Sequence, residues 1–280
     1  MTKDLLDGVD QLDPLPITIQ TLLTKLGDDF VSPREITRVL EYDQAIAAML
    51  LRAANSAAMG ARVRIERISD AVAHLGLDRI LSVAMGAHMK SMSRPVEMYD
   101  LSENDFWLHG AVASVAAKEI AAAAARRGVE VPKQATIAAL MHDVGKLILV
   151  RYTDVDMQAV VDLAREDGIT FVEAERRLLG FDHAEVGGAV AEKWNFPDDI
   201  RDAIARHHDM PVADPTPMTD TVTLSNVIAK TVGVGVGAEG MNLFADRLSM
   251  KRLGLRFPDF ARISSEVMSQ LDGIKQLYGV

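Results

Sequence analysis

Apolar residues recur at spacings of three and four along almost the whole chain, and no run of alternating β-branched residues competes with them. This pattern predicts an all-α protein. The clearest helix start is Ser32-Pro33-Arg34-Glu35, where a capping serine, a proline at the first helical position and a glutamate form a capping box. Thr170 and Glu173 give the same signal before a helix that begins at Phe171.

The periodicity predicts many short helices and one long one. Early in the chain we expect helices from Ile17 to Gly27, from Pro33, over 44–55, from a cap at Ser69 to Gly76, and over 77–89. The first of them should bury Ile17, Leu22, Leu23 and Leu26. A long helix from Ser102 to Arg127 should precede helices over 133–141, 145–152, 155–166, 171–179, 184–194 and 198–207. A polar loop over 209–219 separates these helices from a helical tail.

Residues 91–101, with a proline and two serines among alternating polar positions, are the best candidate for a seam between two halves. We expect an N-terminal helical part over 1–92, a second helical part over 93–235 and a C-terminal helical extension over 236–280. Met85, Met89 and Met92 lie near the seam and could belong either to a docking surface or to the core.

Composition narrows the class of protein. Of the 280 residues 49% are apolar, which is ample for a core. No apolar run reaches the roughly 18 residues that span a bilayer, and the N-terminus lacks a basic region followed by an apolar core. We therefore expect a cytoplasmic protein without a membrane partner. The net charge of −10 argues against nucleic-acid binding, and the absence of cysteine excludes disulfides and thiolate zinc sites.

Five of the seven histidines fall between positions 109 and 208, and they are the candidate chemistry of the chain. His109 follows Asp105 by four residues, so both side chains would point from one helix face and could bind one metal ion. Alternatively, Asp105 is a helix-capping acid and His109 is a core histidine.

His142 and Asp143 are adjacent within an apolar run, where burial of polar groups is costly unless something pairs with them. On a continuous helix their side chains would diverge by about 100°. They can share a metal ion only if the helix breaks, which Gly145 favours. Lys146, one turn after His142, is placed to meet a phosphate; alternatively, its side chain extends to solvent from the helix end.

The remaining histidines lie at expected helix ends. His183 begins a helix in which Gly187 and Gly188 would allow a close approach, or else it is a surface residue. His207 and His208 end a helix, where a doubled histidine most often interacts with the helix dipole. Together the acids and histidines supply enough ligands for one octahedral metal ion or a pair of divalent ions, which would suit phosphoester hydrolysis.

The segment His142-Asp143-Val144-Gly145-Lys146 resembles the signature of the HD superfamily of metal-dependent phosphohydrolases. Three earlier segments are similar to the HDOD family: 12–16, 42–57 with Asn55-Ser56, and 68–77 with Leu75-Gly76. The resemblance covers about residues 12–230. It implies an all-α fold, in which an N-terminal helical part packs on an HD-like helical part. It also implies a regulatory role in bacterial signal transduction, in a family where many members have lost the metal ligands.

Comparison with the related cyclic-di-GMP phosphodiesterases of the HD-GYP type implies a nearly complete ligand set. The matching positions are Asp105, His109, His142, Asp143, His183, His207 and His208. Asn226 stands where the last acidic ligand should be, and a neutral amide is a poorer ligand for a hard divalent cation than a carboxylate. No Gly-Tyr-Pro segment follows the paired histidines.

The residues and the resemblance together predict a regulatory HDOD signalling module that acts through a protein partner or a ligand and keeps part of an HD-type metal site. The alternative is a divalent-metal-dependent phosphohydrolase acting on a nucleotide or cyclic nucleotide, with His142, Asp143 and Lys146 as catalytic residues. The metal would be Fe, Mn, Mg, Ni or Zn. The expected partners are a signalling protein and a phosphate-containing ligand, with no nucleic acid and no membrane.

Overall fold

The computed structural model describes residues 9–10, 12–25, 31–56, 59–61, 63–92, 103–152, 157–209, 214–234 and 247–278. Within these ranges the regular structure is helical and there is no strand, which confirms the predicted all-α fold. None of these helices combines the length and the apolar character that crossing a membrane requires.

The helices fall into three groups along the chain. The first group comprises α2 (Ile17–Leu23), α3 (Pro33–Glu41), α4 (Gln44–Ala54), α5 (Ile68–Leu75) and α6 (Leu77–Met92). The central group comprises α7 (Glu103–Ala125), α8 (Ala135–Met141), α9 (Val144–Tyr152), α10 (Met157–Asp167), α11 (Phe171–Leu179), α12 (His183–Lys193), α13 (Asp198–Ala205) and α14 (Pro217–Thr231). The last group comprises α15 (Arg247–Arg252), α16 (Phe257–Ser269) and α17 (Leu271–Tyr278).

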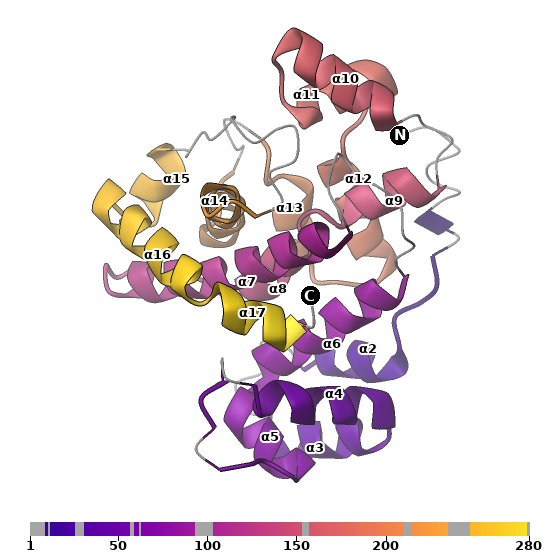
Figure 1. The fold of residues 1–280 in the computed structure, drawn as a ribbon, viewed down its shortest axis with the longest axis vertical. Coiled ribbons are helices and arrows are strands. Elements are labelled where there is room, and N and C mark those ends of the chain that lie inside the picture. The colour runs from indigo at the N-terminus through magenta and orange to yellow at the C-terminus, as the bar shows by residue number, and fades with distance from the viewer. Residues whose placement is uncertain are drawn as a thin grey trace.

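The long helix α7 lies in the middle of the molecule and packs against α8 and α14 (Figure 1). The first group of helices packs at one end, and α10 and α11 pair at the opposite end. Beside α7, the helix α12 packs against α9 and α13. The C-terminal helix α17 contacts α4, α6 and α7, so it bridges the first group and the centre.

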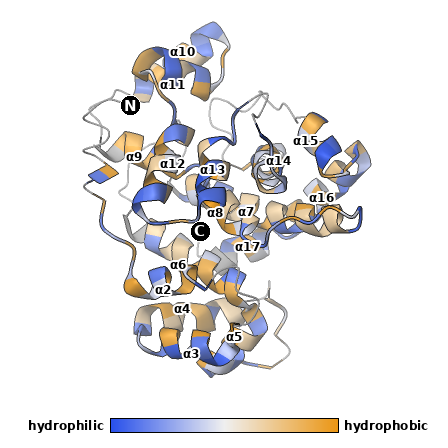
Figure 2. Ribbon diagram, turned by 180° about the vertical axis from the view of Figure 1, so that it is seen from behind, coloured by the Kyte–Doolittle hydropathy of each residue, from blue (hydrophilic) through white to orange (hydrophobic). Residues whose placement is uncertain are grey.

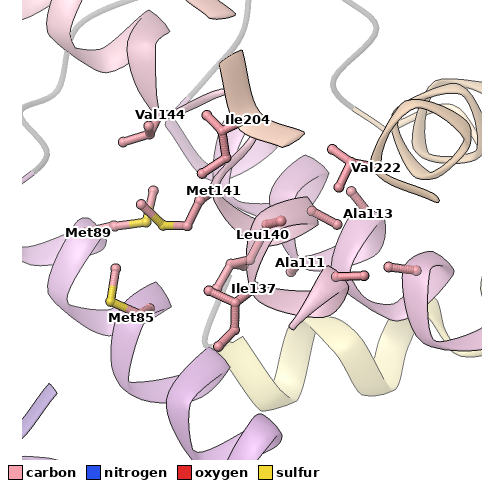
Figure 3. Close-up of a cluster of buried hydrophobic side chains, with 14 of the residues drawn as sticks. Met85, Met89, Ala111, Ala113, Ile137, Leu140, Met141, Val144, Ile204 and Val222 are labelled. Atoms are coloured by element: carbon pink, nitrogen blue, oxygen red, sulfur yellow. The ribbon is translucent and has the colours of Figure 1, made fainter. Parts of the chain in front are cut away.

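Buried apolar side chains form one continuous cluster from the first group of helices to the last. Figure 3 shows Met85 and Met89 of α6 packed near Ile137 and Met141 of α8. Both α6 methionines are buried, so they belong to the core and not to a docking surface. The side chain of Met92 lies outside the described part of the chain. Outer helices such as α10 and α15 carry hydrophilic beside hydrophobic residues (Figure 2), as expected for helices with one face on the core.

The two helix starts predicted from capping signals are confirmed. Ser32 accepts a hydrogen bond from Glu35 N at 3.3 Å before α3. Before α11, Thr170 accepts from Glu173 N at 3.1 Å, and the Glu173 carboxylate accepts from Thr170 N at 2.9 Å. These interactions give N–H groups at the start of each helix a side-chain acceptor.

Two details of the N-terminal helices correct the prediction. α5 begins at Ile68 after an extended Arg67, so Ser69 lies inside the first turn and does not cap the helix. Ile17 is 81% exposed, whereas Ile19 is buried. The buried stripe of α2 therefore passes through Ile19, because the first residue of the helix faces away from the core.

The predicted loop over 209–219 ends earlier than expected. Thr216 caps α14 by accepting a hydrogen bond from Thr219 N at 3.1 Å, so the helix begins at Pro217. Several predictions fall outside the described residues: Leu26, Gly27, Ser102 and most of the seam over 91–101.

Candidate metal centre

The turn between α8 and α9 places His142 and Asp143 at one site. α8 ends at Met141, both residues lie in the turn, and α9 begins at Val144. The helix therefore breaks where a shared site requires a break. Both side chains are buried, with 0% and 6% of their surface exposed.

Two glycines allow the helices around this turn to come close. A Cβ at Gly145 would clash with His183 O and lie 2.7 Å from Gly187 N, so only glycine lets α9 meet the start of α12. A Cβ at Gly110 would lie 2.7 Å from Leu140 O, where α7 meets α8. These approaches bring the histidines of α7 and α12 to the α8–α9 turn.

Three buried imidazoles are each held at Nδ1 by a backbone carbonyl. The acceptors are Val234 O for His109 at 2.8 Å, Ala139 O for His142 at 2.7 Å, and Ile204 O for His207 at 2.7 Å. Because a carbonyl can only accept, Nδ1 carries the proton of the neutral ring, and Nε2 carries the lone pair. This outer hydrogen bond is the usual way in which a metal-binding histidine is oriented.

The Nε2 atoms converge on the two oxygens of Asp143. Oδ1 lies 3.2 Å from His183 Nε2 and 3.7 Å from His207 Nε2. Oδ2 lies 3.6 Å from His142 Nε2 and 3.8 Å from His109 Nε2. The carboxylate therefore divides the cluster into an Oδ1 side and an Oδ2 side.

Lys146 occupies the Oδ2 side of the carboxylate. Its Nζ lies 2.8 Å from Asp143 Oδ2, and its side chain is 5% exposed. Burial opposes the ionisation of Asp143, but Lys146 and the nearby His142 outweigh it and hold the pKa of Asp143 well below its ordinary value. The carboxylate is therefore ionised. The lysine does not extend to solvent, so that alternative is excluded.

Glu175 of α11 orients His183 through Nδ1, the ring nitrogen that does not face Asp143. The fully buried Glu175 carboxylate accepts from His183 N at 2.8 Å and lies 2.8 Å from His183 Nδ1. Burial lowers the pKa of His183, but the charge of Glu175 and the hydrogen bond to Asp143 raise it to about 9. Metal-free His183 is therefore an imidazolium at neutral pH, and metal binding would release its Nε2 proton.

The other four histidines of the cluster are neutral at physiological pH. Burial lowers the pKa of His109 and of His207. Burial also holds the pKa values of His142 and His208 well below the ordinary value, and the positive charges of His183 and Lys230 add to the effect at His208. Neutral imidazoles are the form that binds metal ions.

The arrangement leaves a polar atom without a partner inside the protein. Within the described part of the chain, His207 Nε2 is buried and has no hydrogen-bond partner. His109 Nε2 and His142 Nε2, both with lone pairs, are only 3.2 Å apart. Such contacts are costly unless a cation lies among them. The residues therefore fit a divalent metal ion.

The structure brings six of the seven predicted ligands together. They form two overlapping groups whose ligand atoms lie within 4.8 Å of one another: Asp143, His183, His207 and His208, and His109, His142 and Asp143. Asp105 belongs to neither group, and its side chain is exposed in the first turn of α7. Four residues turn a helix by about 400°, so Asp105 is offset by about 40° from His109 and lies one turn nearer the helix end.

Asn226 of α14 lies at the cluster, as its predicted ligand position requires. Its Oδ1 is 3.2 Å from His109 Nε2, and its side chain is buried. The Oδ2 side therefore has a neutral amide where the resemblance implies an acid.

Sequence reasoning missed two buried charged residues at the cluster. Lys230, which is 9% exposed, follows Asn226 by four residues on α14, and its charge acts on His109 and His208. Its helical spacing from Asn226 was the available signal. Glu175 follows Phe171 by four residues on the buried face of α11, and an acid on an apolar face was the available signal there.

A sequence model of the HDOD domain matches residues 12–210 of the chain. The chain belongs to the HDOD family, which confirms the resemblance found in the sequence. A solved structure of an HDOD domain protein of unknown function from Geobacter sulfurreducens is 27% identical, with a TM-score of 0.78 over 98% of this chain and 96% of that chain.

Other similar proteins are more distant. A Shewanella amazonensis SB2B protein named as a candidate phosphohydrolase is 23% identical, with a TM-score of 0.71 over 99% of this chain and 98% of that one. A Marinobacter aquaeolei VT8 protein named as a candidate signal transduction protein is 23% identical, with a TM-score of 0.83 over 100% of this chain and 61% of that one. These two likenesses show the fold alone. An uncharacterized protein of Treponema pallidum (strain Nichols) is 23% identical over 231 residues, which are 81% of this chain and 44% of that protein. The chain thus spans less than half the length of that relative.

Proposed function

We propose that the chain is a regulatory HDOD module of bacterial signal transduction, which holds one divalent metal ion and acts by binding a signalling partner or a ligand. Its N-terminal part over 1–92 would pack on an HD-like part over 93–235, with a C-terminal extension over 236–280. The observation that carries the metal is the convergence of imidazole Nε2 atoms on Asp143, with each Nδ1 of His109, His142 and His207 fixed by a carbonyl.

The Oδ1 side of Asp143 is the better metal site. Asp143, His183, His207 and His208 offer four ligand atoms within 4.8 Å of one another. Three imidazole nitrogens and one carboxylate oxygen suit Zn, Fe, Mn or Ni better than Mg, which prefers oxygen ligands. Glu175 supports this side by holding His183 Nδ1.

The Oδ2 side is a weaker site for a second ion. Lys146 already neutralises Oδ2 at 2.8 Å, and Asn226 offers an amide oxygen in place of a carboxylate. Lys230 acts on His109 and also on His208, so its charge does not distinguish the two sides. The charge of Lys146 at Oδ2 repels a divalent ion on that side. Loss of the second ion favours a regulatory role over hydrolysis that needs two ions.

A phosphohydrolase acting on a nucleotide or cyclic nucleotide is the second candidate. The observation in its favour is the pair of buried lysines, Lys146 and Lys230, because such ammonium groups could hold a phosphate. A divalent metal ion at the cluster would supply a Lewis acid and an activated water. In this case His142, Asp143 and Lys146 would be the catalytic residues.

Metal content tests the first proposal. The full chain is stripped with chelator, reloaded with Zn, Mn, Fe, Ni or Mg, and measured by elemental analysis and thermal unfolding. We expect about one tightly bound ion per chain in the wild type, its loss in Asp143→Ala and His207→Ala, and its retention in His142→Ala. His74→Ala, outside the cluster, is the matched control. Absence of any stabilising ion would overturn the metal proposal.

Turnover tests the second candidate with the same proteins. Metal-loaded wild type is incubated with a generic phosphodiester, bis(p-nitrophenyl) phosphate, and with cyclic nucleotides. A regulatory module predicts no hydrolysis above the metal-only control. Hydrolysis that disappears in both His142→Ala and Asp143→Ala would establish the phosphohydrolase instead.

A further inference from the structure

A cavity of about 710 Å³ lies apart from the histidine cluster, where α5, α6 and α7 meet the segment before α8 and the turn between α16 and α17. Leu75, Ser114, Thr136 and Gly273 line it from different parts of the chain. Cavities of about 300–1,000 Å³ are typical of small-molecule sites. The space is therefore large enough for a small ligand.

The lining of the cavity includes two neighbouring cations, and Glu119 lies close enough to one of them, Lys118, to oppose the lowering of its pKa. Arg79 of α6 and Lys118 of α7 both line the cavity, and they are close enough for the charge of Arg79 to add to burial in lowering the pKa of Lys118. Arg79 Nη1 donates only to Met59 Sδ, at 3.3 Å, and a thioether is a weak acceptor. Among the described residues Arg79 forms no ion pair.

The other charges of the lining leave it positive. Lys133 interacts with Asp78, and Asp272 is the second acid of the lining. Among the described residues of the lining, three cations therefore stand against two carboxylates. With Asp78 set against Lys133, Arg79 and Lys118 are opposed by Asp272 alone, so the excess is one positive charge. Arg79 is half-buried, and a guanidinium whose acceptor is a thioether is a suitable partner for a carboxylate or phosphate group.

The walls of the cavity are aliphatic. Val83, Val115, Ala121, Val131 and Ile274 contribute to them, and none of the described residues of the lining is aromatic. Aromatic rings are the usual stacking partners of flat heterocycles such as nucleobases. The walls therefore fit a saturated chain better than a base.

We propose that this cavity binds a small organic anion with an aliphatic body, a carboxylate or a phosphate monoester, whose charged group lies between Arg79 and Lys118. The ligand would contact helices of all three groups. Its binding does not require metal at the histidine cluster, so the two sites can be tested separately.

The position of the cavity connects it with the metal centre. Ser114 lines the cavity from α7, five residues after His109, which is roughly 7–8 Å along the helix axis. Thr136 lines it from α8, which ends at the turn that carries His142. A ligand that shifts α7 against α8 would therefore change the spacing of His109 and His142. This gives a regulatory module a route by which a ligand acts on the metal centre.

Binding of simple amphiphilic anions to the full chain tests the proposal. Octanoate and octyl phosphate, below the concentrations at which they form micelles, are titrated by calorimetry in parallel with octanol and inorganic phosphate. We expect saturable binding of at least one of the two amphiphilic anions. Octanol lacks the negative charge, and inorganic phosphate lacks the aliphatic chain. Both should therefore bind at least about tenfold more weakly than the amphiphilic anion.

Charge-removing variants locate the site. Arg79→Gln and Lys118→Gln should each weaken binding of the anion by about tenfold or more, whereas Arg34→Gln, at an exposed position away from the cavity, should leave it unchanged. Lys118 is exposed, so its variant remains informative if the Arg79 variant does not fold. Absence of binding by both amphiphilic anions, equal binding of octanol or phosphate, or wild-type affinity in the folded variants would overturn the proposal.

Discussion

Asn226 Oδ1 lies 3.2 Å from His109 Nε2 on the side of the cluster that also carries Lys146. Because His109 Nδ1 is bound to Val234 O at 2.8 Å, the lone pair of Nε2 faces the amide. A carboxylate at this position would add a negative charge that the amide lacks. The relationship explains why the two sides of Asp143 should differ in metal affinity.

Asn226→Asp should therefore strengthen the Oδ2 side. The added charge supplies a better ligand for a hard divalent ion, so we expect metal retention to rise from about one ion towards two per chain. Elemental analysis after dialysis against a defined free-metal concentration measures the change. Asn104→Asp, at an exposed position of α7, is the control. Unchanged affinity and stoichiometry in Asn226→Asp would contradict this assignment.

Lys146→Met should destabilise the metal-free protein and make metal more stabilising. Removal of one partner leaves Asp143 buried without its 2.8 Å ion pair, at a cost of about 3–5 kcal/mol. Metal should therefore raise the free energy of unfolding of the variant by more than it raises that of the wild type. Denaturant unfolding with and without metal measures both increases. Lys25→Met, which removes the partly exposed Lys25–Glu35 pair at 3.9 Å, should cost at most about 1 kcal/mol. Equal costs for the two lysines would contradict the account.

Glu175→Gln should weaken metal binding, although Glu175 is not one of the proposed metal ligands. The carboxylate fixes His183 Nδ1 at 2.8 Å, and loss of such an outer partner typically lowers metal affinity by about 10–100-fold. Competition with a chromogenic chelator measures the affinity. Glu192→Gln, at an exposed position of the following helix, serves as the control and should retain wild-type affinity. A wild-type affinity in Glu175→Gln would remove the proposed role of Glu175.

Gly145→Ala should be far more damaging than a substitution at a turn glycine. The added methyl group would clash with His183 O, so α9 and α12 must separate, at a cost of at least about 3 kcal/mol. Gly128→Ala adds a methyl group that meets nothing within 4 Å and costs only the strain of a φ of +80°, about 1–2 kcal/mol. Denaturant unfolding compares the two. Similar losses would show that the close approach at Gly145 is not required.

The metal-free protein should lose stability as the pH falls from 7.5 to 5.5. The pKa values of His109, His142, His207 and His208 are lowered by burial, so the unfolded chain binds more protons than the folded one below its own histidine pKa of about 6.5. The contribution of these four neutral rings to the stability of the folded protein is present above this pKa and is lost below it. Thermal unfolding across the range should show the fall, with a shallower slope in His207→Gln. A flat profile would contradict neutral burial of these rings.

At alkaline pH, His183 should affect the stability of the metal-free protein in the opposite direction. Its folded pKa is raised to about 9, so its contribution is complete below the unfolded value of about 6.5 and is lost as the pH rises through about 9. Because Glu175 causes most of the rise, the alkaline loss should be smaller in Glu175→Gln than in the wild type.

Much of the fold was predictable because its signals are local. The capping residues before α3 and α11 lie within three residues of their partners, and helix periodicity identifies the inner faces. Predictions failed where burial depends on distant packing. Ile17 is exposed for this reason, although the helical pattern predicted its burial, and the packing of α6 on α8 decides that Met85 lies in the core and not on a docking surface.

The candidate site was partly predictable from residue type and family resemblance. His142, Asp143 and Asn226 lie together at the cluster, whereas Asp105 is exposed because it lies at the end of α7. The sequence predicts that Gly145 allows a helix break. In the structure Gly145 also allows the close contact with α12, because a side chain at this position would clash with His183 O. Such contacts between segments far apart in the chain leave no local pattern in one sequence.

Anomalous X-ray diffraction from crystals of the full chain grown with zinc tests the central claim most directly. The account predicts one strong anomalous peak among Asp143, His183, His207 and His208, on the Oδ1 side of the carboxylate. Two peaks of equal height on both sides of Asp143, or no peak within the cluster, would contradict it.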